Sequence, residues 1–113
     1  MKLYIFLWES AAADRDDRGW KPLPQGDGMT KPRLLIADDH KIFAEGLKRL
    51  LNADFDIVGV VADGRELVSA AEKLRPDVMV VDISMPMLNG IEAVRQIKKV
   101  HPEIKVVFLT ITG

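Results

Sequence analysis

Seven segments of alternating character follow one another from Arg33 onward, and this alternation restricts the fold more than any other feature of the chain. Short apolar segments, typical of buried strands, occupy residues 33–39, 55–62, 77–82 and 104–110. Segments with helical spacing of apolar residues separate them, at 41–52, 63–76 and 89–102. Strands that alternate with helices form βαβ crossovers, and near-continuous apolar strands are typical of parallel sheets buried on both faces. The pattern therefore predicts a doubly wound α/β domain with a parallel sheet.

The helical segments carry end signals and apolar faces. Asp63 with Glu66, and Asn89 with Glu92, have the spacing of a capping box at a helix N-terminus. Periodicity predicts which apolar side chains face the sheet: Phe43, Leu47, Leu50 and Leu51 in the first helix, and Ile91, Val94, Ile97 and Val100 in the third.

Composition excludes several classes of function. The chain has 113 residues, with 16 Lys plus Arg against 17 Asp plus Glu, so it has no basic excess of the kind that nucleic-acid binding needs. It contains no cysteine, which excludes disulfides, thiolate metal sites and cysteine nucleophiles. This composition fits a reducing, cytoplasmic environment.

The N-terminal segment shows neither the helical nor the strand periodicity of apolar residues. The apolar run from Leu3 to Trp8 is shorter than the ~7–15 residues of a secretory h-region, and no membrane span is expected. Charged residues, Pro and Gly follow it. We expect residues 1–31 to form a disordered extension and residues 32–113 to form the domain. Two interpretations of the extension remain open: a genuine flexible tail, or upstream translation with Met29 as the alternative initiator.

Polar side chains stand at the ends of three of the predicted strands: Asp38 and Asp39, Asp82, and Thr110. The carboxyl ends of parallel strands meet at one edge, where open α/β sheets bind ligands. Carboxylates grouped there without His or Cys ligands suit a hard cation, Mg²⁺ where phosphate is handled, and an aspartate beside Mg²⁺ can accept a phosphoryl group. Asp38 has a second interpretation, as the N-cap of the following helix. His40 is interpreted as a solvated structural residue.

The segment from Arg33 to Gly113 resembles the receiver domain of two-component response regulators. The resemblance rests on Asp38-Asp39 after the first strand, Asp82 ending the third, "SMPMLNG" after it, and Thr110 ending the fourth. The segment "ADDHKIFAEGLKRLL" is similar to the corresponding segment of the NarL/FixJ-type branch of this family. The implied fold is flavodoxin-like (CheY-like), with strand order 2-1-3-4-5 counted along the domain.

The resemblance also implies roles for individual residues. Asp82 is the phosphoacceptor and Thr110 the switch hydroxyl. Asp39, Asp82 and the backbone carbonyl of Ser84 ligate Mg²⁺, and Asp38 belongs to the same metal site by holding metal-bound water. The chain is then a phosphoacceptor signalling module and not an enzyme acting on a separate substrate.

Measured against the family's pattern, the chain ends just after the fourth strand. The resemblance implies that strand five with its lysine, helices four and five and a C-terminal DNA-binding output domain are missing. The fourth strand is then expected to be an unpaired edge. The implied partners are a sensor histidine kinase, DNA only through the absent output domain, and a second copy on phosphorylation of the full-length protein. The alternatives are a Mg²⁺-dependent phosphotransferase or hydrolase on a similar sheet, and a truncated fragment that does not signal.

Overall fold

The computed structural model describes residues 2–8, 31–83, 85 and 90–112 of the chain. They form strands and helices in this order: β1 (Lys2–Trp8), β2 (Arg33–Ala37), α1 (Lys41–Leu51), β3 (Asp56–Val61), α2 (Gly64–Leu74), β4 (Val78–Asp82), α3 (Gly90–Val100) and β5 (Lys105–Thr112). From Arg33 onward this order is the predicted alternation of strands and helices, and the observed ends differ from the predicted ones by a few residues.

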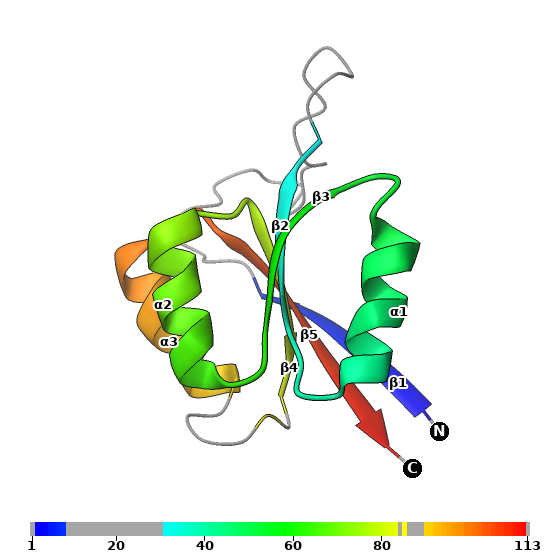
Figure 1. Cartoon of the computed structure of the whole chain (residues 1–113). Coiled ribbons are helices and arrows are strands. Elements are labelled where there is room, and N and C mark those ends of the chain that lie inside the picture. Colours follow the sequence, from blue (N-terminus) through cyan, green and yellow to red (C-terminus); the bar gives the residue numbers. More distant parts are fainter. Residues whose placement is uncertain (1, 9–30, 84, 86–89, 113) are drawn as a thin grey trace, which may run out of the picture.

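One sheet connects all the strands, in the order β1-β5-β4-β2-β3. The neighbours from β3 to β5 are parallel, because each is reached through a helical crossover. Counted from Arg33, their order is 2-1-3-4, which confirms the flavodoxin-like, doubly wound prediction. Helix α1 covers one face of the sheet, and α2 and α3 cover the other (Figure 1).

Two apolar cores lie on either side of the sheet. All residues of the central strand β4 are buried, as expected for a parallel strand covered on both faces. Met79 and Val81 of this strand face the larger core under α2 and α3, while Val78 and Val80 face the smaller core under α1. Because β4 is the central strand, its last residue, Asp82, is held at a fixed position at the end of the sheet where the carboxyl ends of the parallel strands lie.

Strand β1 differs from the predicted organisation. Residues Lys2–Trp8 were expected to be disordered, yet they pair antiparallel with β5, from Lys2 opposite Thr112 to Trp8 opposite Val106. The prediction that β5 is an unpaired edge is therefore wrong as well. The physical reason is the sequence KLYIFLW, whose aromatic and β-branched residues favour strands, beside an edge with free backbone donors and acceptors. Residues 9–30 lie outside the described residues, so the expected disorder there stays a prediction.

The apolar faces of the helices are rotated slightly from the predicted ones. Leu50 is 72% exposed and Val100 is 66% exposed, although both were predicted to face the sheet, and Ile91 is also exposed. The small residues Ala44 and Ala93 lie buried against the sheet instead. Small side chains let a helix approach the sheet closely, so they set the direction of the buried face, and counting only large apolar residues misplaced it.

Helix α2 begins as its capping signal predicts. Asp63 accepts a hydrogen bond from the backbone N–H of Glu66 (2.8 Å), and the Glu66 carboxylate accepts one from the backbone N–H of Ala62 (2.9 Å). Asp63 is thereby confirmed as a cap. Asn89, the predicted cap of α3, lies outside the described residues.

Candidate functional site

The sheet register brings Asp38 and Asp82 to the same level. Ala37, the last residue of β2, pairs with Val81 of β4, so Asp38, just after β2, and Asp82, the last residue of β4, reach the same carboxyl end of the sheet. The backbone N–H of Asp38 donates to the carbonyl of Val61 (2.9 Å), which fixes Asp38 against the end of β3 as well. The convergence of acids predicted from the strand ends is therefore present for these two residues.

Four side chains form one cluster at this edge: Asp38, Asp39, His40 and Asp82. Each offers one ligand atom, and these atoms all lie within 4.8 Å of one another. Asp38 and Asp82 are buried, with residue exposures of 3% and 2%, while Asp39 and His40 are exposed. The cluster is thus half in the protein and half open to solvent, which allows an ion or a small phosphorylated group to reach it.

His40 is a member of the cluster that the sequence interpretation did not count among the site residues. Its Nδ1 lies 3.1 Å from Asp38 Oδ1, 3.2 Å from Asp39 Oδ1 and 3.4 Å from Asp82 Oδ2. Its side chain is 59% exposed, as expected for a solvated residue, and its ring nitrogen also faces all three carboxylates. The signal that could have found it was its position directly after Asp38-Asp39, in the loop that leaves the carboxyl end of β2.

The N-cap of α1 is His40 and not, as the second interpretation of Asp38 had it, Asp38. The side chain of His40 makes no capping hydrogen bond. Asp38 instead accepts the backbone N–H of His40 at Oδ1 (2.8 Å), which holds the loop between β2 and α1. The other oxygen, Oδ2, is buried and has no hydrogen-bond partner within the part of the chain that the structure describes. A buried carboxylate oxygen in this state is costly, so the site favours an additional cation or donor.

The charges in the cluster act on each other. Burial raises the pKa of Asp38 above its ordinary value of 3.8, and the nearby Asp82 adds to this rise, while the hydrogen bonds from His40 oppose it. The hydrogen bond to Asp38 and the charge of Asp39 raise the pKa of His40 above its ordinary value of 6.5. The rise for Asp38 is thus mainly an effect of burial, whereas the rise for His40 comes from the carboxylates around it.

Two further predicted site residues are described only in part or not at all. Ser84 lies outside the described residues. Thr110 lies in β5, directly after Leu109, which pairs with Asp82 in the parallel ladder, but only the backbone of Thr110 is described. Their predicted roles stay predictions.

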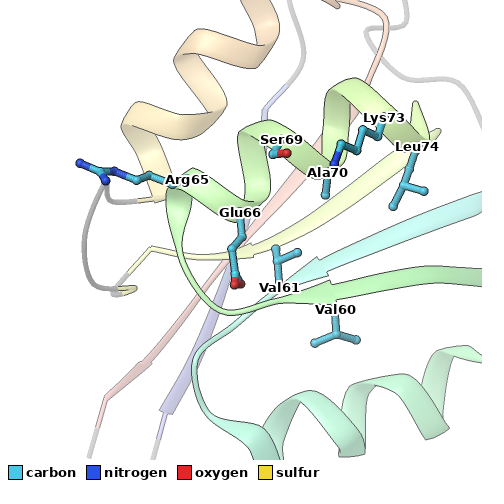
Figure 2. A pocket seen from close by; sticks show the side chains of 8 residues that line it. All are labelled: Val60, Val61, Arg65, Glu66, Ser69, Ala70, Lys73 and Leu74. Atoms are coloured by element: carbon cyan, nitrogen blue, oxygen red, sulfur yellow. The ribbon is translucent and has the colours of Figure 1, made fainter.

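A groove lies between β3 and α2 (Figure 2). Val60, Val61, Ala70 and Leu74 contribute apolar surface, and Arg65, Glu66 and Lys73 contribute charged side chains. None of the four residues of the acidic cluster lines it. Glu66 is already engaged in capping α2, so the groove shows no convergent set of reactive groups.

Comparison with known families matches residues 34–113 to the response regulator receiver domain. The chain belongs to this family. The receiver is 42% identical over 83 residues to the transcriptional regulatory protein DegU of Brevibacillus brevis, covering 72% of this chain and 35% of DegU. It is 42% identical over 82 residues to the response regulator GacA of Pseudomonas viridiflava, covering 70% of this chain and 38% of GacA. The chain therefore spans about a third of the length of these curated relatives.

Solved structures agree with this assignment. The response regulator domain of Thermotoga maritima CheB superposes with a TM-score of 0.61 at 42% identity, covering 64% of this chain and 55% of that chain. A LuxR-family two-component response regulator from Aurantimonas superposes with a TM-score of 0.64 at 30% identity, covering 68% of this chain and 56% of that chain. No helix in the described ranges has the length and hydropathy of a transmembrane segment.

Proposed function

We propose that this receiver accepts a phosphoryl group on Asp82 from the phosphohistidine of a sensor histidine kinase, in a reaction that depends on Mg²⁺. The observation that carries the proposal is the position of Asp82: a buried carboxylate at the end of the central strand, with the ligand atoms of Asp38 and Asp39 within 4.8 Å. Asp63 also follows a strand, but its carboxylate is engaged as a helix cap. This difference is the reason to assign the chemistry to Asp82.

The residues present fit a hard divalent cation. Asp39 and Asp82, with the backbone carbonyl of Ser84, would hold Mg²⁺, and Asp38 would hold a water molecule bound to it. Two features support this assignment. The buried Asp38 Oδ2 has no hydrogen-bond partner among the described residues, and a bound cation or its water would supply one. Three carboxylates in one cluster also repel one another, and a divalent cation would balance their charge. When bound, Mg²⁺ neutralises the oxygens of the transferred phosphoryl group.

The transfer is a substitution at phosphorus. An oxygen of the Asp82 carboxylate attacks the phosphorus atom while the P–N bond to the donor imidazole breaks, and the bonding electron pair leaves with that nitrogen. The product is an acyl phosphate on Asp82 and a free imidazole. Thr110, in the strand beside Asp82, would then donate its hydroxyl hydrogen bond to the phosphoryl group.

The output of the signal is proposed from the relatives. DegU is named a transcriptional regulatory protein, and a solved relative from Staphylococcus aureus is named a DNA-binding response regulator. Another relative, from Photobacterium profundum, is a protein-glutamate methylesterase, so receivers of this kind also accompany enzymes. The resemblance to DegU and GacA favours a cytoplasmic transcriptional regulator whose DNA-binding domain follows the receiver, and which forms a homodimer when phosphorylated.

Phosphotransfer with a matched control tests the assignment. The chain is mixed with a ³²P-labelled phosphohistidine donor and Mg²⁺, and the label on the receiver is followed over time. Asp82→Asn should abolish labelling, whereas Asp63→Asn should not, because Asn caps a helix as well as Asp does. Circular dichroism checks that both variants are folded. Labelling of Asp82→Asn at the wild-type rate would overturn the proposal.

A further inference from the structure

His40 brings a nitrogen to a site whose other ligand atoms are all oxygens. Its Nδ1 lies 3.1–3.4 Å from one oxygen of each of Asp38, Asp39 and Asp82. The side chain is 59% exposed, so it is not held in this position by burial in the core. It is held by the loop between β2 and α1, where the backbone N–H of His40 donates to Asp38.

The spacing of the four atoms is compatible with one ion. Ligands with bonds of about 2.0–2.2 Å lie at most roughly 4.4 Å apart across the ion. The four atoms already lie within 4.8 Å of one another, so only a small approach is needed. The exposed Asp39 and His40 side chains can make this movement without disturbing the buried Asp38 and Asp82.

A second observation points to a ligand in the same place. Asp38 is almost fully buried, and its Oδ2 has no hydrogen-bond partner in the described ranges, while Oδ1 is occupied by His40. The geometry thus leaves a buried carboxylate oxygen with no described partner, and a ring nitrogen facing the carboxylates of the same cluster. A hydrogen bond between His40 Nδ1 and Asp38 Oδ1 (3.1 Å) accounts for the direction of the ring but leaves Asp38 Oδ2 without a described partner, whereas a bound cation would contact both atoms.

The identity of the ligand atoms decides which cation gains most. Sites with oxygen ligands alone suit Mg²⁺, whereas imidazole suits transition metals, whose affinities rise from Mn²⁺ through Co²⁺ and Ni²⁺. We propose that His40 is a nitrogen ligand of the receiver's cation site and increases the preference of this site for Co²⁺ or Ni²⁺ over Mg²⁺. This inference rests on the proposed function, in that the acidic cluster must bind a divalent cation at all.

Titration calorimetry with Mg²⁺ and with Co²⁺ tests the preference in the wild-type chain, in His40→Gln and in Asp39→Ala. If His40 is a ligand, His40→Gln should weaken Co²⁺ binding by roughly tenfold or more and leave Mg²⁺ affinity unchanged or higher. If His40 acts only through its charge, its removal should strengthen the binding of both ions in the same proportion. The ratio of the two dissociation constants therefore separates a ligand from a neighbouring charge.

Proton NMR of the Co²⁺-loaded chain gives a second readout, independent of affinity. Coordination through Nδ1 should produce a hyperfine-shifted, exchangeable N–H proton of the imidazole, and this signal should be lost in His40→Gln. An unchanged ratio of affinities together with no shifted imidazole signal would overturn the inference. Lys41→Gln, which removes a charge on the next, exposed residue, serves as the matched control and should change neither readout.

The proposed function and this inference fail in different ways. If neither Mg²⁺ nor Co²⁺ binds the folded wild-type chain, or if Asp39→Ala binds both with wild-type affinity, the cation site itself is wrongly assigned. If both ions bind, Asp39→Ala weakens both and His40→Gln changes neither, the site stands and only the role of His40 is refuted.

Discussion

Gly90 has no room for a side chain, and this connects the packing of α3 to the phosphoacceptor. A Cβ atom added at Gly90 would lie 2.7 Å from Val81 Cγ1 and 2.8 Å from the backbone oxygen of Asp82. Val81 is fully buried in the central strand, and a backbone oxygen cannot rotate away as a side chain does. Gly90→Ala must therefore push α3 away from the end of β4.

The cost can be estimated from the kind of contact. Forcing an extra methyl group into a packed core typically costs about 1–3 kcal/mol. Alanine favours a helix over glycine by about 0.5–1 kcal/mol in the helix interior, and less at the first helical residue, where Gly90 lies. We expect a net loss of about 1–2 kcal/mol in the free energy of unfolding. For a domain of this size that corresponds to a fall in Tm of roughly 4–16 °C.

Urea unfolding followed by circular dichroism measures the loss, and Gly46→Ala provides the control. Gly46 lies in α1, and a Cβ atom added there would have nothing within 4 Å, so this change should stabilise the chain by about 0.5–1 kcal/mol. The two substitutions are chemically identical and should have opposite signs. Because the clash falls on Asp82, Gly90→Ala should also accept phosphoryl groups more slowly. A Gly90→Ala variant as stable as wild type would refute this account of the packing.

Three further changes test other contacts. Glu72 accepts a hydrogen bond from the buried His101 at 2.8 Å, and this bond lowers the pKa of Glu72 below its ordinary value of 4.5. A carboxylate whose pKa is lowered in the folded state stabilises the fold at pH values above its ordinary pKa, and this contribution is lost as the pH falls through the lower folded pKa. Glu72→Gln should therefore be less stable than wild type at neutral pH, and the difference in stability should shrink in acid. A difference in stability that is constant from about pH 7 to pH 3 would speak against this contact. Arg75 ends α2 in the left-handed region with φ 48°, so Arg75→Gly should stabilise by roughly 0.5–1 kcal/mol in urea unfolding, and a lower midpoint would contradict this. Removing residues 1–8 uncovers the β5 edge, so size-exclusion chromatography should show concentration-dependent association, whereas a monomer at every concentration would show that β1 does not protect this edge.

Much of the fold could be predicted from Arg33 onward because the signals there are local and agree. Apolar strands, helical periodicity and a cap such as Asp63 each mark one element, and the βαβ rule then joins them into a parallel sheet. The sequence KLYIFLW favours a strand locally, but its pairing with β5 could not be predicted in this way, since β5 lies about a hundred residues away along the chain and no local signal specifies the partner. The exposure of Leu50 and Val100 was missed because Ala44 and Ala93 set the helix orientation.

Of the candidate site, only the residues located at the ends of strands could be predicted. Asp38, Asp39 and Asp82 follow parallel strands, so their convergence follows from the topology, and it is present. The direction of the His40 side chain was not predicted, because His40 belongs to a loop, where side-chain direction depends on hydrogen bonds such as that between its backbone N–H and Asp38. No sequence period reports a bond of this kind.

The most direct test of the central claim is to locate the phosphoryl group chemically. The chain is phosphorylated by a phosphohistidine donor with Mg²⁺, the acyl phosphate is reduced with borohydride, and the modified residue is found by peptide mass spectrometry. Reduction converts a phosphorylated aspartate into homoserine, so the label stays at the residue that carried the phosphoryl group. We predict homoserine at position 82. Homoserine at Asp38 or Asp39, with Asp82 unmodified, would contradict the assignment of the phosphoacceptor.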